Sequence, residues 1–160
     1  MTARTIYIDE SLPDRVRAIM EFLLKAAIEA IGADGSSVML LSPGGDILTM
    51  VGMAAREAGV ASNIGISVRK GERVCGRVVQ TGKTAIINGD VQRNPDFSGV
   101  KKYQEIKSGM SSPLRLNGRI LGVLNLKRIM MDAPLNPTEA RIAEALASVA
   151  AGLLRECGLS

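Results

Sequence analysis

The sequence predicts an α+β fold, with a central antiparallel sheet and helices from both chain ends on one face. Two helical patterns of apolar residues lie near the chain ends, at about residues 12–31 and 137–157. Asn117-Gly118 separates two apolar runs, and this dipeptide favours the positive φ angles of a tight hairpin turn. The other apolar runs are short and follow one another closely, which favours locally paired strands over β-α-β winding.

The first helix is expected to begin after Ser11, a candidate N-cap, with Pro13 in its first turn and Asp14 as a capping-box acid. Gly32 is its expected end. Its predicted core-facing stripe consists of Val16, Ile19, Met20, Leu23, Ala27 and Ile31. Phe22, Leu24 and Ile28 lie off this stripe and are expected to form a second surface.

The middle of the chain predicts short strands around one short helix. Strands are expected at 38–42, 47–53, near 66–68 and at 84–88, and a helix at 73–81 that ends at Gly82. The segment 89–107 is long and loop-like, and loops of this length in compact domains are often functional. The strongest hairpin signal follows, with arms at 110–116 and 119–127 and with Pro113 expected at an edge or bulge.

The last helix has a complete N-terminal signature. Asn136 is the expected N-cap, Pro137 the first helical residue and Glu139 the capping-box acid. Its predicted core-facing stripe consists of Ile142, Leu146, Val149, Ala150 and Leu153. Ala140, Ala145, Ala147 and Leu154 are expected to widen the apolar surface toward a second partner.

Composition limits the function classes. The 160 residues predict one domain over 1–160, with its core at about 12–157. The net charge of +4 is scattered and the chain has four aromatic residues, so no nucleic-acid face is expected. There is no apolar run of the ~20 residues that cross a bilayer and no secretory signal pattern, so no membrane partner and a cytoplasmic location are expected.

The absence of histidine excludes histidine-ligated zinc or haem and histidine-based acid–base triads. Two cysteines, Cys75 and Cys157, provide neither a Cys₄ site nor a disulfide framework. We therefore predict no catalytic residues, no metal and no cofactor.

Candidate ligand contacts gather around the long loop and the strand after it. Phe97 and Tyr103 lie in the loop and would anchor it or line a small-molecule pocket. Ser111 and Ser112, beside Met110, present hydroxyls for a ligand or for the loop backbone. Asp90 is a candidate for a polar rim or for turn chemistry, and Cys75 for core packing or a reactive thiol.

The order of several motifs resembles that of GAF domains over about residues 12–157. Residues 71–83 (GERVCGRVVQTGK) resemble the family's central helix segment, 94–97 (NPDF) its loop motif, and 111–114 (SSPL) with 117–126 (NGRILGVLNL) its last hairpin. The resemblance implies a profilin-like fold, in which terminal helices cover one face of the sheet and short helices and loops enclose a pocket on the other. It also implies sensing or dimerisation within signalling proteins.

The specialised chemistries of the family lack their residues in this chain. It has no Asn-Lys-Phe-Asp-Glu signature of cyclic-nucleotide binders, no Cys-His pair for a bilin and no axial histidine for haem. Members that reduce free methionine sulfoxide use several cysteines in the domain body, where this chain has only Cys75.

The resemblance therefore implies a non-catalytic, small-molecule-sensing module of a bacterial-type signalling or transcription-regulatory protein. A homodimer through helices 12–31 and 137–157 would respond to the ligand by repacking these helices. An effector domain (kinase, cyclase or transcription factor) would read the change. The alternatives are a free methionine sulfoxide reductase type of redox enzyme using Cys75, and a ligand-free structural dimerisation domain.

Overall fold

The computed structural model describes residues 2–88, 107–129 and 133–158, and these residues form a seven-stranded sheet with three helices. The strands are β1 (Thr5–Ile8), β2 (Gly35–Leu41), β3 (Ile47–Ala55), β4 (Ser67–Arg69), β5 (Ala85–Asn88), β6 (Ser108–Leu116) and β7 (Arg119–Arg128). The helices are α1 (Asp14–Ile31), α2 (Arg73–Thr81) and α3 (Pro137–Glu156). The strand order is β1-β3-β2-β7-β6-β5, with β4 also paired to β3, and every pair is antiparallel. The predicted α+β class is confirmed.

β1 is an edge strand that the sequence did not reveal. It pairs with the end of β3 from Thr5↔Ala55 to Ile8↔Gly52. Its four residues are too few to establish an alternating pattern by themselves, so its pairing depends on the exposed edge of β3.

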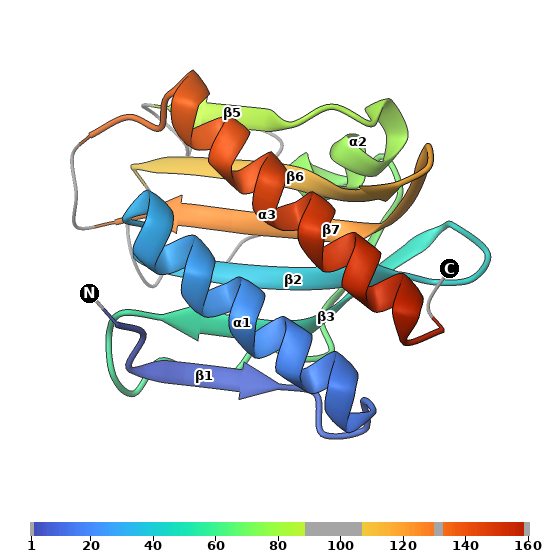
Figure 1. The fold of residues 1–160 in the computed structure, drawn as a ribbon. Helices are drawn as coiled ribbons and strands as arrows, with labels where there is room; N and C mark the ends of the chain where they lie inside the picture. Colours follow the sequence, from blue (N-terminus) through green and yellow to red (C-terminus); the bar gives the residue numbers. More distant parts are fainter. Residues whose placement is uncertain (1, 89–106, 130–132, 159–160) are drawn as a thin grey trace.

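α1 and α3 lie side by side across one face of the sheet and run in opposite directions (Figure 1). The α1 residues that face the sheet and α3 are fully buried: Val16, Met20, Leu23, Leu24, Ala27, Ile28 and Ile31. The expectation that Leu24 and Ile28 belong to a second surface is therefore wrong, because the helix packs against both the sheet and α3 and buries a wider arc than one stripe. Phe22 does point outward, with 48% of its surface exposed.

In α3 the buried face is shifted around the helix from the predicted stripe. The buried residues are Ala140, Ala143, Ala147, Ala150, Ala151 and Leu154. Of the predicted stripe only Ala150 is fully buried, whereas Val149 and Leu153 are 54% and 43% exposed. The small alanine side chains let the helix backbone approach the sheet and α1 closely, and Val149 and Leu153 remain on the outside.

The two long helices begin differently. Asn136 and Glu139 form the predicted capping box at the start of α3, with Pro137 as its first residue. At α1 the N-cap position is Pro13, without a side-chain cap, and Ser11 instead bonds to the carboxylate of Asp9. The expected Ser11 cap is therefore wrong, because the helix begins two residues later than that cap requires.

The Asn117-Gly118 turn joins β6 and β7 as predicted, with φ of 51° and 79°. Pro113 lies in β6 opposite Val123, beyond the Ala85↔Ser111 end of the β5 pairing and next to a register shift at Leu114/Arg115. At this place its missing N–H interrupts no bond to β5.

The other face of the sheet carries α2 and a smaller apolar cluster. Met39 and Val123 from the sheet pack there with Cys75, Val78 and Val79 of α2. We call this the α2 face, and the opposite one the helix face. No helix among the described residues has the length and apolar character needed to span a bilayer.

Candidate functional site

A row of polar side chains crosses the α2 face on three adjacent strands. Ser37 on β2 lies opposite Asn125 on β7, which lies opposite Ser111 on β6. The neighbours of each in its strand face the long helices, so alternation places these three on the α2 face. The Ser111 hydroxyl donates to Asn125 Oδ1, and Asn125 Nδ2 donates to Ser37 Oγ at 3.3 Å. We call these three residues the polar row.

Lys127 lies two residues beyond Asn125 on the same face. Its neighbours in the adjacent strands are Gly35 on β2 and Gly109 on β6. A Cβ added to Gly35 would come within 2.6 Å of Lys127 Cε, so the lysine stem occupies the space above this glycine. The side chain thus extends across β2, next to the strand position of Ser37.

Two opposing effects act on the charged form of Lys127, namely burial and the attraction of nearby carboxylates. Burial lowers the pKa of its ammonium, and the attraction of the Asp34 and Glu57 carboxylates only partly opposes this effect. Asp34 also serves other groups, because Oδ1 accepts from Arg56 at 3.3 Å and Oδ2 accepts from the Ile129 N–H at 2.6 Å. Glu57 lies on an exposed segment just after β3.

The segment after β3 borders this site beside β1 and β3. The Tyr7 hydroxyl donates to the Val60 carbonyl at 2.8 Å, and the Asn63 N–H points to Met53 Sδ at 3.2 Å. Met53 lies opposite Ser37 in the sheet. Residues 56–66 are therefore held next to the row by contacts with β1 and β3.

α2 holds Cys75 at the apolar end of the same face. Its first residue, Arg73, has a positive φ of 53°, and a Cβ on Gly76 would lie 2.4 Å from the Arg69 carbonyl oxygen, so only glycine allows this close approach. Burial raises the pKa of the Cys75 thiol. Cys157 packs against the helix-face cluster, so the two thiols lie on opposite faces of the sheet.

The predicted ligand contacts do not all meet at one place. Ser111 and Cys75 lie on the α2 face. Met110 packs in the core under the long helices, and Ser112 on the same side of β6 bonds to Thr84. Because successive strand residues point to opposite faces, Met110 and Ser112 do not share a site with Ser111. Asp90, Phe97 and Tyr103 lie outside the described residues.

Ser37, Asn125 and Lys127 were not among the predicted contacts. A signal was present, because Asn125 and Lys127 interrupt the apolar run of β7 at alternate positions. Ser37 has no such signal by itself. It is brought to Asn125 only by the β2–β7 pairing, which joins segments 88 residues apart.

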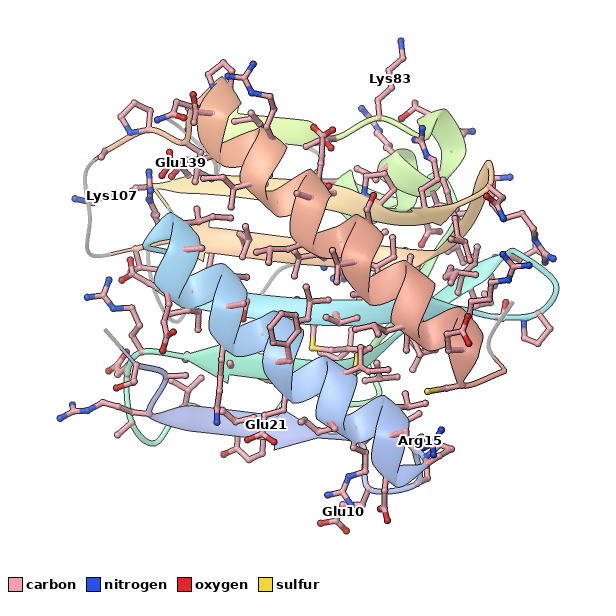
Figure 2. The ribbon with its side chains drawn as sticks, in the orientation of Figure 1. Glu10, Arg15, Glu21, Lys83, Lys107 and Glu139 are labelled. Carbon is pink, nitrogen blue, oxygen red and sulfur yellow. The ribbon has the colours of Figure 1, made fainter. Side chains whose placement is uncertain are left out.

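Arg128, the residue after Lys127, belongs to the helix face. It is buried and donates to the carbonyls of Ile31 and Gly32 at the end of α1, at 2.6 and 3.4 Å. It also donates to the Ala133 and Pro134 carbonyls before α3 and pairs with Glu139 of the capping box. One end of β7 thus holds the end of α1 and the start of α3 together (Figure 2, where Glu139 is labelled).

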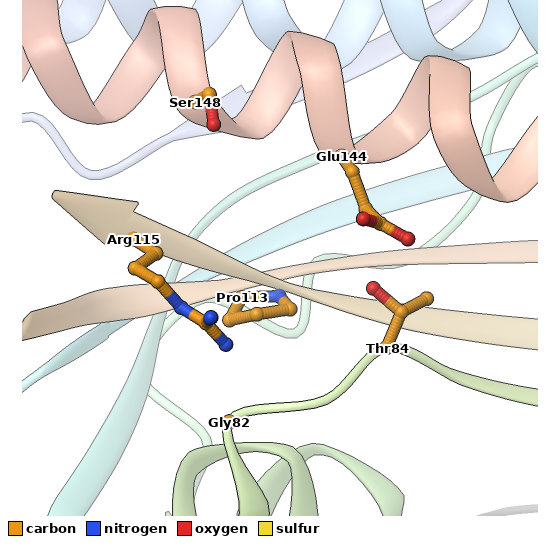
Figure 3. Close-up of a pocket in the computed structure, with 6 residues that line it drawn as sticks. All are labelled: Gly82, Thr84, Pro113, Arg115, Glu144 and Ser148. Carbon is orange, nitrogen blue, oxygen red and sulfur yellow. The ribbon is translucent and has the colours of Figure 1, made fainter. Parts of the chain in front are cut away.

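A separate pocket of about 150 Å³ lies between α3 and β6 (Figure 3). Its lining residues are Gly82, Thr84, Pro113, Arg115, Glu144 and Ser148. None of them belongs to the polar row, and Glu144 and Ser148 are exposed residues of α3. This pocket is therefore distinct from the α2-face site.

Comparison with solved structures finds the same fold in signalling proteins and in enzymes. A GAF domain/HD domain protein from Geobacter sulfurreducens has a TM-score of 0.74 at 10% identity, covering 92% of this chain and 95% of that one. The GAF domain of a phosphoenolpyruvate-protein phosphotransferase from Coxiella burnetii has 0.73 at 16%, covering 91% and 85%. Free methionine-R-sulfoxide reductase from Neisseria meningitidis, solved with its substrate, has 0.68 at 22%, covering 91% and 80%.

Sequence comparison points to the same family. None of the curated proteins matches the chain. The family model described as GAF domain matches residues 14–155, which is most of the sequence. This span includes α1, the whole polar row and nearly all of α3. The chain belongs to the GAF domain family.

Proposed function

We propose that this GAF domain is a non-catalytic sensory or regulatory module that binds a small molecule on its α2 face and signals through α1 and α3. The observation that carries the proposal is the chemical difference between the two faces at one end of β7. Asn125 and Lys127 face the candidate site, while Arg128 holds the two long helices. We further propose that the domain is cytoplasmic and works with an effector domain of a signalling protein.

The proposed site combines the polar row and Lys127 with Cys75 at the α2 end. Asp90, Phe97 and Tyr103 remain proposed contacts from the segment between β5 and β6. Met110 and Ser112 are proposed to act through helix packing, since they contact the helix face. Three hydrogen-bonding side chains on rigid central strands are typical of groups that orient a ligand in a pocket.

Coupling would follow from the register of β7. A shift of β7 under a ligand at Asn125 or Lys127 also moves Arg128, because consecutive strand residues share one backbone. Arg128 contacts carbonyls at the end of α1 and before α3, so a small displacement changes the relative position of both helices.

The output surface would be the outer side of these helices, in a homodimer through residues 12–31 and 137–157. Phe22, Val149 and Leu153 are exposed there, and Ile142 and Leu146 are half-buried. Large apolar residues that a helix leaves in water favour burial against a second copy.

The site is tested by comparing Ser111→Ala with Ser112→Ala, two adjacent serines on opposite faces. Native mass spectrometry of the purified protein is expected to show a bound small molecule in the wild type and in Ser112→Ala, and its loss or weakening in Ser111→Ala. Wild-type protein that carries only its own mass, and that no member of a metabolite panel stabilises against heat, would support the ligand-free dimerisation domain instead.

The dimer is tested by sedimentation velocity at micromolar concentration. The wild type is expected to sediment as a dimer and Leu153→Glu as a monomer with an unchanged circular dichroism spectrum. Arg155→Gln, also exposed on α3, changes the net charge by the same single unit, so it is the matched control and should remain dimeric. A monomeric wild type would exclude this part of the proposal.

A second candidate is a redox enzyme that acts on free methionine sulfoxide through Cys75. The likeness to the Neisseria enzyme favours it. The burial of Cys75, its raised pKa and the position of Cys157 on the other face argue against it, since an attacking thiol needs thiolate character and a resolving partner within reach. Reduction of methionine sulfoxide by the wild type and not by Cys75→Ala would establish it, whereas no turnover by either protein would exclude it.

A further inference from the structure

The donors of the α2-face site gather at one end of the polar row. The hydrogen bonds run in one direction, from the Ser111 hydroxyl to Asn125 and from the Asn125 amide to Ser37. Ser37 accepts in this bond and therefore keeps its own O–H for donation. Asn125 Nδ2 keeps a second N–H, and the Lys127 ammonium extends over β2 from the next position on the same face.

Two carboxylates, those of Asp34 and Glu57, already attract the Lys127 ammonium at this end. Asp34 uses its two oxygens for Arg56 and the Ile129 N–H, and Glu57 lies on an exposed segment. Removal of Lys127 from water outweighs the attraction of both carboxylates. A further negative charge beside the ammonium would offset that desolvation, so the site is more favourable when an anion occupies it.

The two strand positions beside Lys127 are glycines. Its two strand neighbours are Gly35 and Gly109, which have no side chains on this face. The lysine stem fills the place above Gly35. The donors here are one lysine, one amide and one hydroxyl. One cation with two neutral donors matches the single charge and two oxygens of a carboxylate, whereas many phosphate sites add a helix N-terminus or an arginine fork.

We propose that the α2 face binds the carboxylate of a small organic acid, with Lys127 as its counter-ion and Asn125 and Ser37 as its hydrogen-bond donors. This inference rests on the proposed ligand site and names the chemical class of its ligand. The polar row orients the acid on the sheet, and Lys127 supplies the discrimination between the acid and its uncharged analogues.

The test uses matched pairs of carboxylates and their primary amides, from acetate and acetamide to octanoate and octanamide, at constant ionic strength. Saturable binding is measured by calorimetry and by the shift in unfolding temperature. The wild type is expected to bind at least one carboxylate and to bind its amide at least about tenfold more weakly. Lys127→Met, which keeps the stem and removes the charge, is expected to lose this preference.

Lys83→Met is the control, because Lys83 is exposed beyond the end of α2 and should leave binding unchanged (Figure 2). Equal binding of acid and amide by the wild type, or an unchanged preference in folded Lys127→Met, overturns the carboxylate inference. It leaves the proposed function standing if Ser111→Ala still weakens binding. A wild type that binds no member of the panel also overturns the inference, and the native mass of the purified protein then decides the proposed function separately.

Discussion

The two faces of the sheet differ in the interactions that stabilise them and in the polar groups that they carry. On the helix face, two long helices bury a continuous apolar layer, and its buried arginine is paired and bonded to backbone carbonyls. On the α2 face a smaller apolar cluster gives way to a hydroxyl–amide row and a lysine whose burial is incompletely compensated. The helix face therefore provides most of the stability, and the α2 face provides the polar groups on which the proposed recognition depends.

The largest effect is expected from Arg128, where the helix face has its most concentrated polar contacts. Arg128→Met should lower the free energy of unfolding by about 3–5 kcal/mol, because it leaves Glu139 and several carbonyls without their donor. Urea denaturation measures the change. Arg141→Met, an exposed arginine of α3, should stay within about 0.5 kcal/mol of the wild type. Similar losses in both variants would mean that Arg128 does not hold the helices.

Two adjacent leucines of α3 separate the inner and outer sides of the helix layer. Leu154 is fully buried and Leu153 is 43% exposed. Leu154→Ala should cost about 2–5 kcal/mol through the cavity it leaves. Leu153→Ala should cost about 0.5 kcal/mol or less in the monomer and should weaken self-association instead. Thermal unfolding and sedimentation at several concentrations separate these effects. A larger loss of stability in Leu153→Ala than in Leu154→Ala would contradict the burial of the alanine-rich side of α3.

The contrast between the two helix starts predicts a smaller effect. Asn136→Ala should lower the free energy of unfolding by about 1 kcal/mol, because the Asn136 side chain accepts the Glu139 N–H. Ser11→Ala should change it by less than about 0.5 kcal/mol, since Ser11 caps no helix. Chemical denaturation of both variants checks the difference, and equal effects would show that Ser11 supports α1 after all.

The smallest effect concerns the α2 face and its pH dependence. The pKa of Lys127 is lower in the native chain than its usual value of 10.5, so the unfolded chain binds more protons between these two values. The contribution of Lys127 to the free energy of unfolding therefore rises as the pH rises through that window. The cost of burying its charged form is fully present at neutral pH. Without a bound anion, Lys127→Met should be at least as stable as the wild type at pH 7. The difference should shrink toward pH 10.5 in urea titrations. A variant that is less stable at neutral pH would show that the carboxylates of Asp34 and Glu57 already compensate the charge.

The antiparallel α+β class, the Asn117-Gly118 hairpin and the capped start of α3 were predictable from local sequence. These features depend on residues close together in the chain, such as the reciprocal bonds of Asn136 and Glu139. Ser111 and Cys75 were also predicted from the sequence as candidate ligand contacts. Tertiary packing sets which side of α3 is buried, because the choice between alanines and larger residues depends on how closely the helix approaches the sheet. It also decided the polar row, since Ser37 meets Asn125 only after β2 and β7 pair, and strand alternation then separates Ser111 from Met110 and Ser112.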